Sequence, residues 1–106
     1  MKDFRTYQLA VDFYHLCSKL QLRYHLREQL MRAASSIALN LAEGSGRRSA
    51  REQRRFFDIA MGSLRECQAI LDLCHSQSST AKKRADSLAA HLYRLIQIVQ
   101  SRADRG

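Results

Sequence analysis

The sequence predicts an all-α fold, an up-and-down four-helix bundle, and three observations support this prediction. The chain contains no proline, and few stretches alternate apolar with polar residues, so strands have little support. Apolar residues instead recur every three or four positions in four segments, which is the spacing of one helix face. Short polar stretches separate these segments, as loops do in an up-and-down bundle. We expect a single domain over residues 1–106, with helices at about 5–22, 26–43, 50–75 and 81–102.

The first helix is predicted by an apolar stripe near the start of the chain. This stripe consists of Leu9, Phe13, Leu16 and Leu20. A second set of apolar residues follows, made of Leu22, Leu26, Leu30, Ala33, Ile37 and Leu41. The six residues from Leu20 to Leu26 rotate the stripe by about 240°, so one straight helix could not bury both sets on one side. We therefore expect a turn near residues 23–25, although no glycine or proline marks it.

The boundary between the second and third helices carries clear local signals. Gly44 stands where a left-handed C-terminal cap favours a residue without Cβ, and Ser45 and Gly46 continue the loop. Ser49 and Glu52 match a capping box, in which the serine accepts from the third helical N–H and the glutamate reaches back. We therefore expect the third helix to begin at Ala50.

The last two helices follow from two further stripes. The third stripe contains Phe56, Ala60, Ser63, Cys67, Ile70 and Cys74, and the fourth contains Ala85, Leu88, Leu92, Leu95 and Val99. The polar stretch 76–80 between them should end the third helix, and Ser79 or Thr80 can cap the fourth.

Composition and charge restrict the class of protein. Eighteen lysines and arginines against ten acidic residues give a formal charge of +8, so the molecule should attract polyanions such as nucleic acid or acidic protein. Cysteines occur three times, at Cys17, Cys67 and Cys74. This odd number, without a secretory signal, favours free thiols in the cytoplasm. No apolar run reaches the roughly 18 residues that a membrane span needs, so we expect no membrane partner.

Enzymatic and metal-binding motifs are absent from the sequence. The cysteines and histidines lack C-x2-C or H-x3-H spacing, so buried thiols are favoured over a metal site. There is no G-x-S-x-G nucleophile motif, and the glycines of GSGRRS lie too close together for a P-loop. We therefore expect a protein that is not an enzyme, with no catalytic residue, no metal and no cofactor.

A concentration of arginines is the main functional signal. Five arginines and one glutamate lie between positions 47 and 55, and residues 82–84 form a second basic cluster. Arginines at a helix N-terminus suit phosphate oxygens, but a solvated basic face with Glu43, Glu52 and Asp58 as partners is an equal alternative. The candidate nucleic-acid-binding residues are Arg47, Arg48, Arg51, Arg54, Arg55, Lys82, Lys83 and Arg84.

Glu43 and Asn40 invite structural interpretations. Glu43 lies in the last turn of the second helix, where the helix dipole disfavours an anion, so we expect a structural ion pair with Arg47, Arg48 or Arg32 rather than catalysis. Asn40 is either a buried residue that fixes packing register or an exposed amide. The many small residues of segment 31–42, and Gly62 with Ser63, suggest close approach between helices.

Residues 29–66, QLMRAASSIALNLAEGSGRRSAREQRRFFDIAMGSLRE, contain R-A-A with S-I, N-L-A-E-G, a basic turn and F-x-x-I-A-x-G-S-x-x-E. This pattern resembles the signature of bacterial four-helix-bundle proteins encoded in intervening sequences of large-subunit ribosomal RNA genes. FRTYQLAVDFYHL and the final helix fit more loosely. The resemblance implies a homopentameric ring that binds nucleic acid, and kinship with the accessory variability proteins of diversity-generating retroelements, which bind a reverse transcriptase and its template RNA.

The resemblance also assigns structural or ring-contact roles by position. The matching residues are Arg32, Asn40, Glu43, Gly44, Arg47, Gly62, Ser63 and Glu66. Relatives often carry a longer, proline-containing connection between the first two helices, so the subgroup stays open. Our expectation is a ring-forming protein, not an enzyme, that binds nucleic acid backbones, RNA before DNA. The alternative is a retroelement adaptor that docks a reverse transcriptase and its template RNA.

Overall fold

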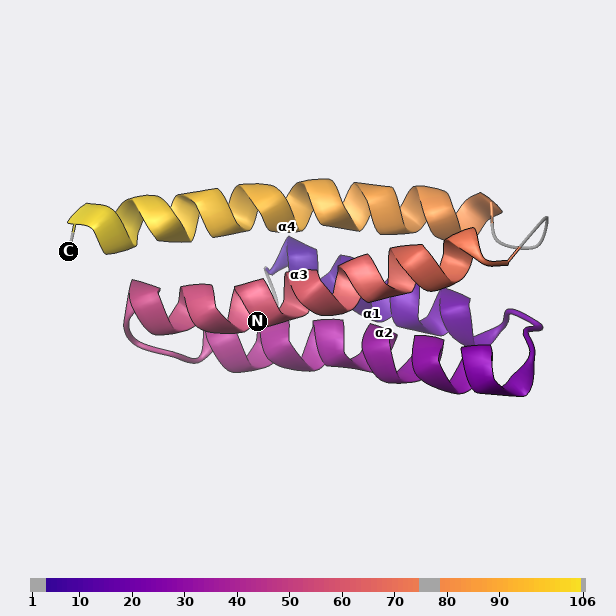
Figure 1. Ribbon diagram of the computed structural model, residues 1–106. Helices are drawn as coiled ribbons and strands as arrows, with labels where there is room; N and C mark the ends of the chain where they lie inside the picture. The colour runs from indigo at the N-terminus through magenta and orange to yellow at the C-terminus, as the bar shows by residue number, and fades with distance from the viewer. Residues whose placement is uncertain (1–3, 75–78, 106) are drawn as a thin grey trace.

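Four α-helices make up the fold of the computed structural model, which describes residues 4–74 and 79–105. The helices are α1 (Arg5–Ser18), α2 (Tyr24–Ser45), α3 (Ala50–Asp72) and α4 (Ser79–Arg105), and the described residues contain no strand. Successive helices run in opposite directions along a molecule of 46 × 22 × 18 Å (Figure 1). The predicted all-helical fold with four helices is confirmed.

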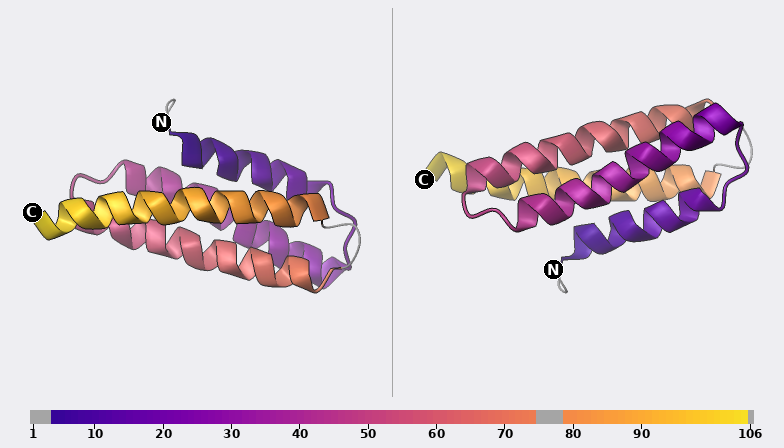
Figure 2. Two further views of the ribbon diagram at one scale, coloured as in Figure 1. Left: turned by 90° about the horizontal axis from the view of Figure 1, so that it is seen from above. Right: turned by 90° about the horizontal axis from the view of Figure 1, so that it is seen from below.

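The arrangement leaves α4 unequally covered. α3 packs against both α2 and α4, and α1 packs against α2 and α4 from the other side. α1 has 14 residues and α4 has 27, so α1 accompanies only the first part of α4 (Figure 1, Figure 2). The C-terminal part of α4 extends past the start of α1. A long stretch of α4 surface is therefore free of α1.

The core confirms many of the predicted apolar positions but shifts the stripes on α1 and α3. On α3, Phe57 and Leu64 are buried, whereas the predicted Phe56 and Ser63 are half-buried. On α4, Ala85, Leu88, Leu92 and Val99 are buried as expected. On α1 the buried residues are Thr6, Ala10, Phe13 and Cys17, whereas Leu9 and Leu16, and Leu20 just after the helix, are half-buried. The three leucines pack against this core from its edge. The buried face of α1 thus combines the large ring of Phe13 with smaller side chains.

The connection between α1 and α2 lies earlier than predicted. α1 ends at Ser18, whose Oγ donates to the carbonyl of His15 at 2.6 Å, and residues 20–23 are not helical. Leu20 and Leu22 both pack against the core. Residues i and i+2 point about 200° apart on a helix but to the same side of an extended chain. The chain leaves the helix at this point, which allows both leucines to reach the core.

Gly44 does not form the predicted left-handed cap. It lies inside α2, which continues to Ser45, and no described glycine has a positive φ. A Cβ on Gly44 would lie 2.6 Å from Cε1 of Phe57 and 3.0 Å from Cβ of Phe56. Glycine is required here because the start of α3 packs directly on the backbone of α2.

The start of α3 confirms the predicted N-cap. Ser49 has an extended backbone, and its Oγ accepts from the Glu52 N–H at 3.1 Å. At its other end, α3 stops at Asp72, three residues before the predicted end. Ser79 and Thr80 already lie within α4, so neither is the predicted cap. Residues 75–78, which include most of the polar connection, lie outside the described residues.

The three cysteines form no disulfide and are buried, as predicted. Burial raises the pKa of the Cys17 thiol to about 12. The pKa of Cys67 is raised further, first by burial and then by the nearby Cys17 and Glu66. Both thiols are therefore protonated and unreactive near neutral pH.

Candidate nucleic-acid interface

The two basic clusters predicted from the sequence lie at opposite ends of the bundle. The α2–α3 loop, the start of α3 and the end of α4 share one end, which we call the arginine end (residues 44–55 and 94–105; Figure 1). Residues 82–84 lie in the first turns of α4, at the end where α1 and α3 finish. This second end buries Cys17, Cys67 and Cys74, and we call it the thiol end. The structure therefore separates the eight candidate residues into two surfaces.

Two arginines of the first cluster form ion pairs with carboxylates four residues away in the sequence. Arg47 Nη2 donates to Glu43, which confirms the structural ion pair predicted for that glutamate. The Arg47 guanidinium also lies over the Phe56 ring, 4.8 Å from its centroid. Arg54 Nε pairs with Asp58 at 3.2 Å. These contacts fix the two side chains, and they reduce the charge that each offers to a ligand.

The other three arginines of this cluster are exposed. Within residues 4–74 and 79–105, Arg48, Arg51 and Arg55 have no carboxylate partner. The Arg55 guanidinium also lies over this ring, 5.6 Å from the Phe56 centroid, so Phe56 supports both Arg47 and Arg55. An arginine that rests on an aromatic ring keeps its N–H donors free for an anion. The start of α3 thus presents three unneutralised guanidinium groups.

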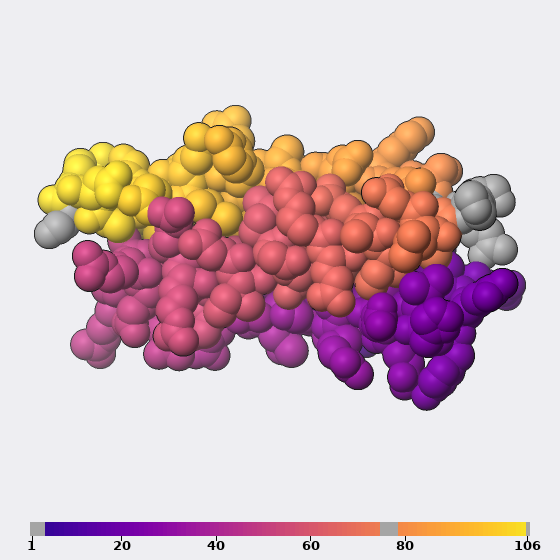
Figure 3. Space-filling model, in the orientation of Figure 1, coloured from indigo at the N-terminus to yellow at the C-terminus, as the bar shows by residue number. Residues whose placement is uncertain are grey.

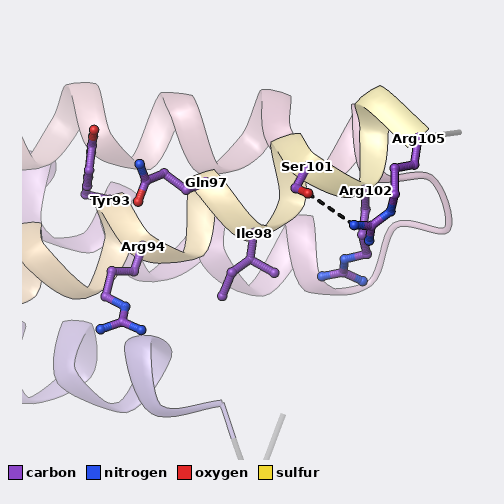
Figure 4. Close-up of a pocket in the computed structure, with 7 residues that line it drawn as sticks. All are labelled: Tyr93, Arg94, Gln97, Ile98, Ser101, Arg102 and Arg105. Carbon is purple, nitrogen blue, oxygen red and sulfur yellow. Dashed lines mark hydrogen bonds between the residues drawn. The ribbon is translucent and has the colours of Figure 1, made fainter.

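Sequence reasoning missed the contribution of α4 to this end. Arg94, Arg102 and Arg105 line an open groove of about 660 Å³ with Tyr93, Gln97, Ile98 and Ser101 (Figure 4). Arg105 Nη1 donates to Ser101 Oγ at 3.2 Å. Arg54 and Arg105 also line a neighbouring hollow, so the α3 and α4 surfaces adjoin. The space-filling view shows the end of α4 directly beside the start of α3 (Figure 3).

The topology of the bundle, rather than a run of charged residues, could have identified these three arginines. Arg94, Arg102 and Arg105 are eight and three residues apart, so no basic cluster is visible in the sequence. In an up-and-down bundle, however, the end of the fourth helix must return to the start of the third. That rule would have placed them beside residues 50–55.

The second predicted cluster has a different setting. Lys82 Nζ lies 3.8 Å from Asp72 Oδ1, whereas Lys83 and Arg84 are exposed. They lie near the start of α4, at the opposite end of the bundle from the α2–α3 loop (Figure 1). Residues 82–84 are therefore a separate basic patch of the thiol end.

The residues predicted to make packing contacts divide into two groups. Ser36 and Ser63 share a hydrogen bond of 2.8 Å between α2 and α3. Asn40 Nδ2 donates to the Ser36 carbonyl at 2.9 Å, so this half-buried amide supports the same contact. Gly62, in contrast, has open space where its Cβ would be, which contradicts the predicted close approach to a helix of the same chain. Arg32 and Glu66 are exposed.

Other kinds of site find no support in the described part of the chain. No group of three or more histidine, cysteine or acidic side chains could hold a metal ion there. No helix among the described residues is long and apolar enough to cross a membrane. The molecule is a four-helix bundle whose distinguishing surface is a cluster of arginines at one end.

Comparison with known families agrees with this class of protein. The family described as 23S rRNA-intervening sequence protein matches residues 4–101. Because the match covers nearly the whole chain, the protein belongs to this family. A search of curated proteins finds no match.

Proposed function

We propose that this protein binds the phosphate backbone of nucleic acid, RNA rather than DNA, through its arginine end and without catalysing a reaction. The observation that supports this most is the set of exposed arginines at the start of α3, Arg48, Arg51 and Arg55, which no described carboxylate neutralises. Arginine donates two parallel hydrogen bonds to phosphate oxygens, and its charge is permanent.

Several features of the arginine end support binding to a backbone rather than to base edges. The arginines lie on an open surface, and Arg102 and Arg105 extend the charged area onto a second helix. Contacts of this kind release counterions and depend little on sequence. The family description names a ribosomal RNA gene element, which favours RNA as the first polymer to test.

Self-association into a homopentameric ring is part of the same proposal. A protomer with a formal charge of +8 would give a pentamer of about +40, so one polyanion could engage several arginine ends at once. Exposed apolar side chains, among them Leu39 and Ile59, offer surface that a neighbouring copy could cover. Light scattering across a range of concentrations would give the mass, and a persistent monomer would contradict the ring.

Matched charge reversals at the two ends test the binding site. The double variant Arg51→Glu, Arg55→Glu should weaken binding of a structured RNA by at least about tenfold at moderate salt. Its plot of log K against log salt should become shallower by about 1.4 to 1.8, the values for two phosphate contacts on a single strand and on a duplex.

The control is Lys83→Glu with Arg84→Glu, which makes the same change of charge on exposed residues of the thiol end. This variant should bind RNA nearly as well as the wild type. Equal losses in the two double variants would mean that net charge alone attracts RNA, and an unchanged affinity of the first variant would remove the site from the arginine end.

A further inference from the structure

The groove along the C-terminal part of α4 combines charge with exposed apolar surface. Its floor and walls come from one helix, where residues three and four apart lie on one face. Arg94, Ile98 and Arg102 follow one side of α4, and Tyr93 and Gln97 follow the other (Figure 4). Tyr93 is 57% exposed and Ile98 is 53% exposed. Binding of phosphates alone does not require exposed aromatic and aliphatic side chains such as Tyr93 and Ile98.

Tyr93 holds a particular position among these residues. It lines both the groove and the neighbouring hollow of about 570 Å³ that reaches Arg54 on α3. Its ring therefore stands between two concave surfaces, each with arginine on its wall. Within the described residues, neither Arg94 nor Arg102 has a carboxylate partner.

We infer that this groove binds a single-stranded segment of nucleic acid, with phosphates on Arg94, Arg102 and Arg105 and an unstacked base on the Tyr93 ring. The inference deepens the proposed function and rests on it, because it names the form of nucleic acid that the arginine end takes. From Arg94 to Arg105 the helix rises about 16 Å, the length of a few nucleotides.

The apolar residues favour a single strand over a duplex. A duplex hides its bases and presents phosphate and sugar to a shallow surface, so Tyr93 and Ile98 would gain little from it. A single strand can turn a base onto an aromatic ring while its backbone follows the charges, and this works for any base. The open, shallow shape of the groove suits such a flexible strand.

A tryptophan reporter tests this arrangement directly, since the chain has no tryptophan of its own. Tyr93→Trp keeps an aromatic ring in the groove. Its fluorescence should be quenched by a single-stranded oligouridine of about twelve nucleotides, because a stacked base quenches indole. A duplex RNA of the same length should leave the fluorescence nearly unchanged at saturation.

The matched control is Tyr24→Trp. Tyr24 is 74% exposed and begins α2 at the thiol end, far from the groove. Its tryptophan should keep its fluorescence with either RNA. Equal quenching of the two reporters by the single strand would overturn the inference, because the strand would then contact the protein without preference for the groove.

Affinity measurements separate stacking from other roles of Tyr93. Tyr93→Ala should weaken binding of the single strand by about tenfold and leave duplex binding unchanged, and Tyr93→Phe should restore wild-type affinity. If Tyr93→Ala lowers the mass of the assembly but not the affinity for the strand, the tyrosine belongs to a contact between copies, and the inference is wrong.

The same measurements distinguish a failure of this inference from a failure of the proposed function. A wild-type protein that binds duplex and single strand equally, with no effect of Tyr93→Ala, would remove this inference and leave the proposed function intact. A wild-type protein that binds neither RNA would remove the proposed function, and the inference with it.

Discussion

The two ends of the bundle carry basic residues for different reasons. At the arginine end, Phe56 supports Arg47 and Arg55, and Gly44 lets α3 pack directly onto α2. At the thiol end, Lys82 approaches Asp72, and the cysteines fill the core below. The arginine end therefore carries its cations where α3 packs closely on α2. The thiol end carries a basic patch near the buried cysteines. In the sequence both ends appear only as clusters of basic residues, so this difference is not visible there.

High pH should have the largest effect and should act through the thiol end. Burial raises the pKa of Cys17 from its ordinary 9.0 to about 12, and that of Cys67 is also raised. The folded state therefore holds these protons more tightly than the unfolded state does. Their contribution to stability is complete below pH 9 and is lost as the pH rises toward 12. Urea unfolding followed by circular dichroism should show a steep fall in stability over this range.

The control for this prediction is Cys17→Ala with Cys67→Ala. The variant should be less stable at pH 7, because it leaves a cavity, but its stability should depend less steeply on pH above 9. The same alkaline slope in variant and wild type would assign the loss to other groups.

Gly44→Ala should have the next largest effect and should act at the arginine end. The new methyl would lie 2.6 Å from the ring of the buried Phe57, so the ring or the two helices must shift. Overpacking of this kind typically costs about 1 to 3 kcal/mol of unfolding free energy. RNA affinity should fall as well, because the neighbouring Phe56 supports two arginines. A variant as stable as the wild type would contradict the close packing of α3 on α2 at Gly44.

Ser49→Ala should lower stability by about 1 kcal/mol, because it removes the N-cap acceptor of α3. Ser49→Asp should retain the cap, and thermal unfolding of the two variants measures the difference. Since the aspartate adds a negative charge beside Arg48 and Arg51, it should also weaken RNA binding. Intact RNA binding by the aspartate variant would argue against phosphate contact at this turn.

Gly62→Ala should have the smallest effect and the opposite sign. Nothing lies within 4 Å of the position that its Cβ would take, so alanine should stabilise the middle of α3 by about 0.5 to 1 kcal/mol. Gly44→Ala is the matched comparison, since both variants replace a helical glycine with alanine. Destabilisation would mean that another copy of the chain packs against Gly62, which light scattering on the variant would reveal.

The sequence predicted what depends on local periodicity and capping. The stripe of α4 and the N-cap at Ser49 need only neighbours along the chain, and both were found correctly. The left-handed cap at Gly44 was wrong, because the reason for that glycine is the Phe57 ring, thirteen positions away. The end of α1 was placed too late for a similar reason, since Leu20 and Leu22 respond to the core rather than to a local breaker.

The candidate site was predicted in part for the same physical reason. The cluster at positions 47–55 is contiguous and therefore visible, although the sequence could not separate the paired Arg54 from the exposed Arg51 and Arg55. Arg105 lies beside it only because α4 packs against α3, which brings Arg105 and Arg54 to one hollow. Sites assembled from distant segments require the topology before their residues can be grouped.

Hydrogen exchange of the wild-type protein, with and without a single-stranded RNA, tests the central claim most directly. We predict that the RNA protects backbone amides in residues 47–55 and 93–105 and leaves residues 79–86 unchanged. Protection confined to residues 79–86, or spread evenly along the chain, would contradict the assignment of binding to the arginine end.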